Sequence, residues 1–205
     1  EHCVIVPELL GQTEVSRLRS IVLRNAVVRD GERHVITRPD DPTAPASSIM
    51  VIVANNSPKV KTYYAHGYTE NAEDNKPTCF SNDGVKPDAS VQNPQCSNCR
   101  MCPHNVFGTA RNENGGFGKG KACSDSIRLA VITGNDDEVY LLRVPPASLR
   151  FIGQYSKSLG KIPMNGVLTK VSFDINAAAP QLQFQFAGFL DEEQYKRAVA
   201  MGKSD

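Results

Sequence analysis

Residues 127–144 read Ile127-Arg-Leu-Ala-Val-Ile132-Thr-Gly134-Asn-Asp-Asp137-Glu-Val139-Tyr-Leu-Leu-Arg-Val144. Two short apolar runs, 127–132 and 139–144, flank a Gly-Asn-Asp-Asp segment of turn-forming residues. Apolar runs of this length around a turn predict two paired β-strands. This hairpin begins the most regular third of the chain and indicates a fold that is mainly β.

The segments around the hairpin predict further elements. A helix is expected over 148–159, where apolar residues fall at helical spacing and Gly160 follows as a stop. Alternating apolar residues predict strands at 167–175 and 182–186, and a final helix begins at Asp191, with Gln194 placed for a capping box. Upstream, the run 49–54 is apolar on both faces and predicts a buried strand.

The expected order is strand, long insertion, strand, strand, helix, strand, strand, helix. Five strands with a helix between the third and fourth follow the order of an OB-fold. We therefore expect an α+β, mainly β chain with an OB-like barrel core of residues 1–58 and 127–205. Residues 59–126 show almost no periodicity and are rich in Gly, Pro, Asn, Asp and Ser, so we expect them to form an insertion between strands one and two.

Composition narrows the function classes. The chain has 205 residues, a net charge of +1 and no apolar run near the ~20 residues of a membrane helix, so no membrane partner is expected. No signal peptide is visible at the start Glu-His-Cys-Val-Ile-Val. The four histidines form no recognisable catalytic motif, and no P-loop is present, so we expect no enzymatic activity.

Five of the six cysteines lie between positions 79 and 123. Thiolates at Cys-x-x-Cys spacing can bind one metal ion from the same side, and four thiolates make the closed site of structural zinc. We expect one structural Zn²⁺ to be bound by Cys79, Cys99, Cys102 and Cys123. Cys96 is an alternate ligand in place of Cys79 or Cys99, because Cys96 and Cys99 have the same spacing as Cys99 and Cys102. A disulfide cluster is the competing interpretation, Cys3 is expected to be a remote free or buried thiol, and His104 could replace one sulfur.

Basic and aromatic residues interleave in two segments, 59–68 and 107–121. Proteins bind single-stranded nucleic acid with cations that contact phosphates and flat rings that stack on bases. The predicted nucleic-acid-binding residues are Lys59, Lys61, Tyr63, Tyr64, Phe107, Arg111, Phe117, Lys119 and Lys121. A structural interpretation competes here too, with solvated loop lysines and with tyrosines that pack the insertion.

Three motifs carry a resemblance. Cys79-Phe-Ser-Asn-Asp-Gly-x-x-Pro, Cys99-x-x-Cys-Pro-x-Asn-x-Phe-Gly-Thr and Gly120-Lys-Ala-Cys, followed by the strand pair, resemble a group of proteins encoded by tailed bacteriophages, over about residues 50–190. The architecture more loosely resembles phage single-stranded DNA-binding proteins in which a zinc subdomain interrupts an OB-fold. Cys96 departs from the pattern, and residues 201–205 are not the long acidic tail that many such proteins carry.

The resemblance implies a non-catalytic single-stranded DNA-binding protein of phage replication or recombination, in the cytoplasm of the infected bacterium. One alternative is a zinc-containing interaction module that docks on RNA polymerase or a phage replication protein, which the near-neutral charge favours. A virion component is a further alternative.

Overall fold

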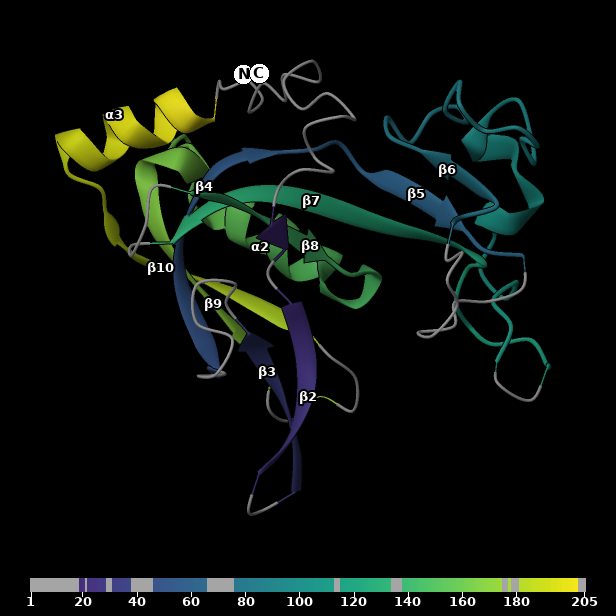
Figure 1. Cartoon of the computed structure of the whole chain (residues 1–205), viewed down its shortest axis with the longest axis horizontal. Helices are drawn as coiled ribbons and strands as arrows, with labels where there is room; N and C mark the ends of the chain where they lie inside the picture. Colours follow the sequence, from purple (N-terminus) through teal and green to yellow (C-terminus); the bar gives the residue numbers. More distant parts are fainter. Residues whose placement is uncertain are drawn as a thin grey trace. The chain divides into compact units, whose positions relative to one another are not determined.

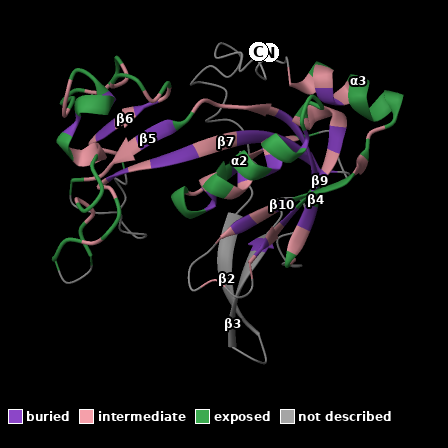
Figure 2. Cartoon of the chain, turned by 180° about the vertical axis from the view of Figure 1, so that it is seen from behind, coloured by how far each residue is buried: buried purple, intermediate pink, exposed green. Residues whose placement is uncertain are grey.

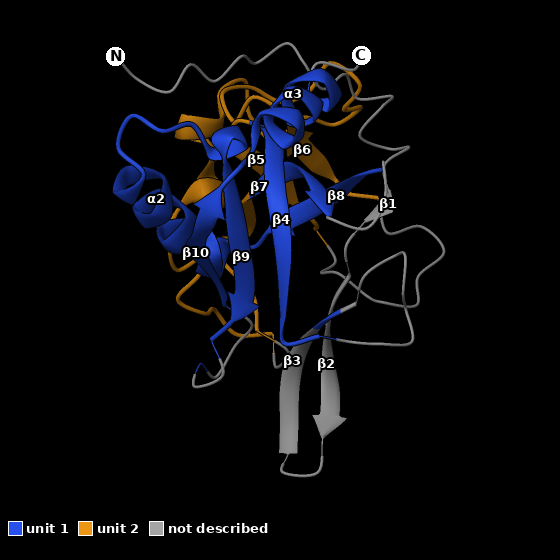
Figure 3. Cartoon of the chain, turned by 90° about the vertical axis from the view of Figure 1, so that its left-hand side faces the viewer, with its two compact units in different colours: residues 1–57, 127–205 blue, residues 58–126 orange. Residues whose placement is uncertain are grey.

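The computed structural model describes residues 19–20, 22–28, 31–37, 46–65, 76–112, 115–133, 138–174, 177 and 181–202 (Figure 1). Over 19–35 and at 37 it describes the backbone alone. The chain divides into two compact units, the first of residues 1–57 and 127–205 and the second of residues 58–126 (Figure 3). The expected turn at 134–137, the end of the aromatic segment at 66–68 and Cys3 lie outside the described residues.

The first unit contains an open sheet with the strand order β1-β8-β7-β4-β9-β10. Neighbouring strands are antiparallel except for β1 and β8, which are parallel. Among the described strands, β10 pairs with β9 alone, so this sheet has a free edge at β10. The strands are β1 (Arg19–Ser20), β4 (Ser48–Asn56), β7 (Cys123–Thr133), β8 (Val139–Val144), β9 (Val167–Phe173) and β10 (Leu182–Phe189), and β2 (Val22–Val28) and β3 (Gly31–Thr37) form a separate pair.

Side-chain alternation along the strands gives this sheet two apolar faces. On one face, Val51 and Val131 belong to the main core, which Ile152 and Tyr155 of helix α2 (Leu149–Ser158) complete. On the other face, Ile52 and Ile132 pack with Ala198 of helix α3 (Glu192–Met201). Figure 2 shows runs of buried residues along β4 and β7, and buried residues that alternate with less buried ones along β9. Successive residues of a strand point to opposite faces, so one apolar run supplies both clusters.

Helix α2 ends and helix α3 begins where the sequence predicts. Gly160 follows α2 with φ +63°, the left-handed conformation that stops a helix and that glycine adopts without penalty. Asp191 caps α3 by accepting from the Gln194 backbone N–H at 2.8 Å, and the Gln194 side chain accepts from the Asp191 N–H at 3.1 Å. Short 3-10 turns, η3 (Pro146–Ser148) and η4 (Met164–Gly166), precede α2 and β9. Within the described ranges, neither the length nor the apolar character of any helix suffices to cross a lipid bilayer.

The strands expected at 49–54, 127–132, 139–144, 167–175 and 182–186 are present as β4, β7, β8, β9 and β10. Two expectations need correction. β7 begins at Cys123, four residues earlier than predicted, and β9 ends at Phe173. The second unit also contains strands of its own, β5 (Val60–Tyr63) and β6 (Cys79–Ser81), which are too short to show a periodicity in the sequence.

In the second unit, β5 lies between β6 and the first four residues of β7, antiparallel to both. Two 3-10 turns follow β6 in the chain, η1 (Cys99–Met101) and η2 (Pro103–Asn105). The backbone N–H of Cys99 donates to the Val85 carbonyl at 2.8 Å, and the N–H of Asp88 donates to the Phe80 carbonyl at 2.9 Å. Hydrogen bonds of this kind order a segment that has little regular secondary structure.

Gly84 allows two backbone segments of this unit to approach each other closely. Its φ is +72°, and a Cβ added there would lie 2.3 Å from the Lys59 carbonyl oxygen. Replacing Gly84 by alanine is therefore expected to destabilise the second unit by about 2–4 kcal/mol, measured by hydrogen exchange of its backbone amides. Gly153→Ala is the control, because Gly153 lies in α2 with nothing within 4 Å of an added Cβ, and alanine should stabilise that helix by about 0.5–1 kcal/mol. Equal effects of the two changes would contradict the assigned role of Gly84.

Candidate metal centre and nucleic-acid interface

The short sheet of the second unit places two predicted metal ligands in one row. Tyr63 on β5 lies opposite Cys79 of β6 on one side and opposite Cys123 of β7 on the other. Residues directly opposite one another in antiparallel strands project from the same face. Cys79 and Cys123 therefore flank Tyr63 on a shared face, and both are buried.

The other two predicted ligands come from the turns. Cys99 begins η1 and Cys102 links η1 to η2, and both are buried. Asn98 caps η1 by accepting from the Arg100 N–H at 2.8 Å, and the Asn105 amide donates to the Cys99 carbonyl at 2.8 Å. These side-chain hydrogen bonds hold the Cys-x-x-Cys segment in its turns.

The five thiols of the second unit influence one another. Burial is the largest cause that raises the pKa of the Cys123 thiol to about 11; the charge of Lys61 lowers it, and the neighbouring Cys102 and Cys99 contribute to the rise. Burial is also the largest cause that raises the pKa of Cys99, to which Cys79 and Cys102 add. Cys96 is half-buried and hydrogen-bonds to Cys102, and burial together with this bond raises its pKa to about 11. All five are free thiols, so the described structure does not contain the competing disulfide cluster.

The chemistry of this cluster fits a soft metal ion. Four buried thiols within one unit are the donor set that structural zinc prefers. No three His, Cys, Asp or Glu side chains of the described residues are already arranged as a metal site. Cys79 and Cys123 lie on either side of β5, two strand spacings or roughly 9–10 Å apart between their Cα atoms. Because this separation does not decide which four thiols would bind one ion, Cys96 remains the alternate ligand. Zinc remains a prediction.

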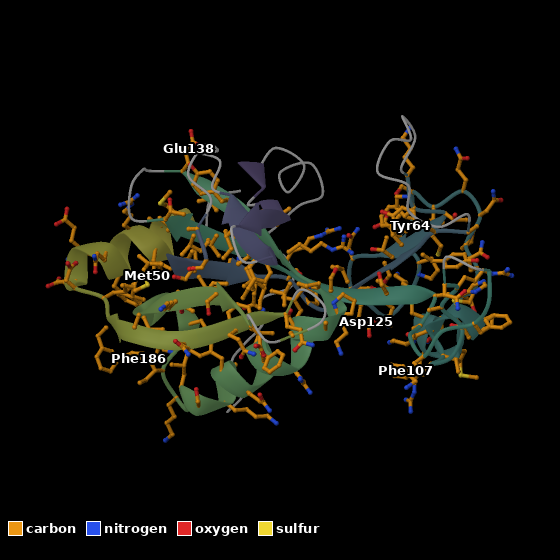
Figure 4. All side chains as sticks on the ribbon, turned by 90° about the horizontal axis from the view of Figure 1, so that it is seen from below. Met50, Tyr64, Phe107, Asp125, Glu138 and Phe186 are labelled. Carbon is orange, nitrogen blue, oxygen red and sulfur yellow. The ribbon has the colours of Figure 1, made fainter. Side chains whose placement is uncertain are left out.

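A buried cluster of charges lies two residues along the same strands. Lys61 of β5 pairs in register with Ser81 and with Asp125 of β7, which is labelled in Figure 4. The Lys61 ammonium donates to the Asp125 carboxylate at 2.6 Å and to Asn105 Oδ1 at 3.0 Å. Lys121 donates to the other oxygen of Asp125 at 2.5 Å and to the same Asn105 oxygen at 3.0 Å.

This cluster corrects the role expected for Lys61. Its side chain is 9% exposed and paired, so it does not present a cation on an open groove. Burial alone would raise the pKa of Asp125, but hydrogen bonds and charge from Lys121 and Lys61 outweigh it and hold that pKa below its usual value. Two lysines share one carboxylate, so the cluster carries an excess positive charge beside the thiols. The charge of Lys61 acts on Cys99 and Cys123 to favour their thiolate forms.

A cleft of about 530 Å³ opens in the second unit. The rings of Tyr63 and His104 stack beside it, with centroids 4.0 Å apart and planes inclined by 14°. Its lining comprises Thr62, Tyr63, Tyr64, Ala65, Pro103, His104, Thr109, Ala110, Arg111, Phe117, Lys121, Ala122 and Ser124. Five of the predicted nucleic-acid-binding residues therefore meet at one cleft: Tyr63, Tyr64, Arg111, Phe117 and Lys121.

The glycine-rich loop folds back on itself as an irregular hairpin. Bridges join Phe107 to Lys121 and Arg111 to Phe117. The Phe107 and Phe117 side chains are 77% and 73% exposed. The Arg111 guanidinium lies 5.7 Å from the centre of the Phe117 ring, and the Lys121 ammonium lies 5.4 Å from that of Phe107. The loop therefore presents two aromatic rings to solvent, each with a cation beside it (Phe107 is labelled in Figure 4).

The remaining predicted binding residues lie outside the cleft lining. Lys59 and Lys119 are exposed, and Phe107 is on the hairpin but does not line the cleft. Sequence reasoning missed Asn105 and Asp125 as partners of the lysines. Asp125 lies two residues after Cys123, and residues two apart in a strand point to the same face. This spacing was the signal that could have placed Asp125 on the face of Cys123.

No family model, curated protein or solved structure matches this chain.

Proposed function

We propose that this chain is a non-catalytic single-stranded DNA-binding protein of a tailed bacteriophage that acts in DNA replication or recombination in the host cytoplasm. The observation that carries the proposal is the cleft of the second unit, at which Tyr63, Tyr64 and Phe117 gather beside Arg111 and Lys121. Rings that stack on bases and cations that contact phosphates are the two components of sequence-tolerant strand binding.

The rings divide by exposure. Phe117 and Phe107 are open to solvent, so either can accept a base without rearrangement. Tyr63 already stacks on His104, so a base at the cleft would extend an existing stack. Each stacked base contributes about 1–3 kcal/mol to binding.

The cations also differ in their exposure to solvent. Arg111, Lys59 and Lys119 are exposed and are the proposed phosphate contacts. Lys121 lines the cleft but is bound to Asp125, so it adds positive potential while it stays paired. Lys61 is buried and stabilises the fold of the second unit through its ion pair with Asp125.

Zinc has a structural role in this proposal. The ion would be held by Cys79, Cys99, Cys102 and Cys123, with Cys96 as the alternate, and would fix η1 and η2 against the short sheet. A closed tetrathiolate site has no open coordination position, so it does not act on a substrate. The thiols thus shape the cleft and the aromatic hairpin.

The first unit supports an OB-like core. Its strands β4, β7, β8, β9 and β10 occur in the order expected for strands one to five, with α2 between the third and fourth. Their spatial order is β8-β7-β4-β9-β10, which is that of an OB-fold opened between its third and fifth strands. Closure into a barrel stays part of the proposal.

A second candidate is a protein-interaction module for RNA polymerase or a replication partner. It is favoured by Met101, Val106 and Phe107, which follow one another closely in sequence and are 81%, 55% and 77% exposed. Exposed apolar patches often mark protein interfaces. Partners retained on the immobilised chain after nuclease treatment, and lost in Met101→Ser, would favour this candidate.

The cleft is tested by Phe117→Ala and Arg111→Gln. Phe117→Ala should weaken poly-dT binding by about 1–3 kcal/mol, a roughly five- to 150-fold higher Kd, because one stack is lost. Arg111→Gln should lower the salt dependence, the slope of log K against log salt, by about 0.7. Val85→Ala and Lys86→Gln are the matched controls, since both residues are exposed in the same unit and away from the cleft lining. If the controls weaken binding as much as the cleft variants, the cleft is not the binding site.

A further inference from the structure

One segment of the first unit, residues 139–173, concentrates positive charge. It has no Asp or Glu and five basic residues, which are Arg143, Arg150, Lys157, Lys161 and Lys170. The whole chain has a net charge of only +1, so the rest of the chain is net acidic. Basic residues that gather in one part of a nearly neutral chain are typical of a surface that binds a polyanion.

Helix α2 carries part of this charge on the side that faces solvent. Ile152 and Tyr155 belong to the buried core, and between them in the chain the exposed residues of α2 recur (Figure 2). Arg150, Gln154 and Lys157 are exposed and follow one another at intervals of four and three residues. This spacing places their side chains in one stripe along the helix, away from the core.

The stripe is not neutralised within the described part of the chain. No carboxylate of the described residues forms an ion pair with Arg150 or Lys157. Arg150 lies in the first turn of α2, where the helix dipole disfavours a cation and where no acidic residue is present. Helix α3 of the same unit has Glu192 and Glu193 in its first turn instead. A departure from a local rule of this kind is expected at a functional site.

The two cations of the stripe are placed to contact a chain of phosphates. The Cζ atom of Arg150 lies 4.4 Å from the centre of the Phe151 ring, and Phe151 packs against the main core. Stacking occupies one face of the planar guanidinium and leaves the N–H groups at its edge free to donate to phosphate oxygens. Lys157 lies seven residues further along, two helical turns or roughly 10 Å away. The two cations can therefore contact different phosphates of one strand.

We propose that the exposed stripe of α2, formed by Arg150, Gln154 and Lys157, binds the phosphate backbone of single-stranded DNA. The inference rests on the proposed function for the identity of the ligand, and it extends DNA contact from the cleft of the second unit to the first unit. Charge complementarity between a stripe without acidic residues and a phosphodiester backbone favours this occupant. Phosphate contacts carry no sequence information, so the stripe contributes affinity and not sequence preference.

Titration of the zinc-loaded full chain with poly-dT at several salt concentrations tests the stripe. The double variant Arg150→Gln/Lys157→Gln should reduce the magnitude of the slope of log K against log salt by about 1.4, because each phosphate contact to a single strand contributes about 0.7. Its Kd should rise about tenfold. Glutamine forms helices nearly as well as arginine and lysine, so α2 should stay folded, which circular dichroism checks.

Two further double variants isolate the position of the charges. Lys86→Gln/Lys196→Gln makes the same change in net charge at two exposed lysines outside α2 and the cleft lining, and should leave the salt slope unchanged. Arg150→Lys/Lys157→Arg keeps both charges and should bind as the unmodified chain does. If Arg150→Gln/Lys157→Gln retains the slope and Kd of the unmodified chain, the stripe is not a binding site and the proposed function stands.

A strand without bases separates the stripe from the cleft. An abasic oligodeoxynucleotide keeps the phosphates and offers nothing to stack, so its binding should be about tenfold weaker in Arg150→Gln/Lys157→Gln and unchanged in Phe117→Ala. Equal binding of the abasic strand by the unmodified chain and Arg150→Gln/Lys157→Gln overturns the inference. Absence of poly-dT binding by the unmodified chain overturns both the proposed function and the inference that takes its ligand from it.

Discussion

Cys102→Ser is expected to unfold residues 58–126 while the sheet of the first unit persists. Cys102 is buried, interacts with the thiols of Cys96, Cys99 and Cys123, and links η1 to η2. A structural zinc site contributes roughly 10–16 kcal/mol of apparent binding free energy, comparable to the whole stability of a domain. The described part of this unit has little regular structure that could compensate for that loss, because β5 and β6 have four and three residues.

Limited proteolysis followed by mass spectrometry measures this effect. New cleavage sites should appear within 58–126 in Cys102→Ser, and the β7–β8 hairpin should remain protected. Chelation of the unmodified chain should reproduce the pattern, and elemental analysis should give one zinc per chain. Cys96→Ser is the matched variant. If Cys96 does not bind the zinc ion, this variant should retain both its zinc and its resistance to protease. Retained protease resistance in Cys102→Ser would contradict the metal centre.

Asp125→Asn is expected to have the second large effect. It removes the carboxylate shared by Lys61 and Lys121, whose side chains are 9% and 16% exposed. Two buried ammonium groups would then lack a counter-charge, and breaking a buried ion pair from one side costs about 3–5 kcal/mol. The change should lower the free energy of opening of the second unit, measured by hydrogen exchange at the β5 amides.

Two further variants isolate the charge effect. Asp125→Glu restores the carboxylate and should recover part of the loss. Glu192→Gln breaks the exposed pair between Glu192 and Lys196, whose side chains are 82% and 72% exposed, and should cost no more than about 0.5 kcal/mol. A loss from Asp125→Asn as small as that from Glu192→Gln would show that the buried cluster contributes little.

The fold of the first unit was accessible from its sequence because local patterns agree with tertiary structure. The two apolar runs 127–132 and 139–144 pair as β7 and β8 in antiparallel register, and Asp191 and Gln194 form the capping box expected from their spacing. β5 and β6 were not predicted, since strands of four and three residues are too short for alternation to be recognised.

The candidate site was only partly accessible. The Cys-x-x-Cys spacing pointed to the thiol cluster, and the aromatic and basic residues pointed to the cleft. Lys61 was predicted to contact phosphates because basic and aromatic residues interleave around it in the sequence. Its partner Asp125 lies 64 positions further along the chain, and only the pairing of β5 with β7 brings them together. The spacing of Asp125 from Cys123 indicates the strand face on which it lies, but the sequence contains no local signal that β7 would pair with β5 and bring Asp125 to Lys61.

Titration of the zinc-loaded chain with poly-dT tests the central claim most directly. The chain has six tyrosines and no tryptophan, so quenching of tyrosine fluorescence reports bases that stack at Tyr63 and Tyr64. A single-stranded DNA-binding function predicts saturable quenching with about micromolar Kd at low ionic strength, weaker binding as salt rises, and loss of binding after chelation. Absence of salt-sensitive binding by the zinc-loaded chain at low ionic strength would contradict it.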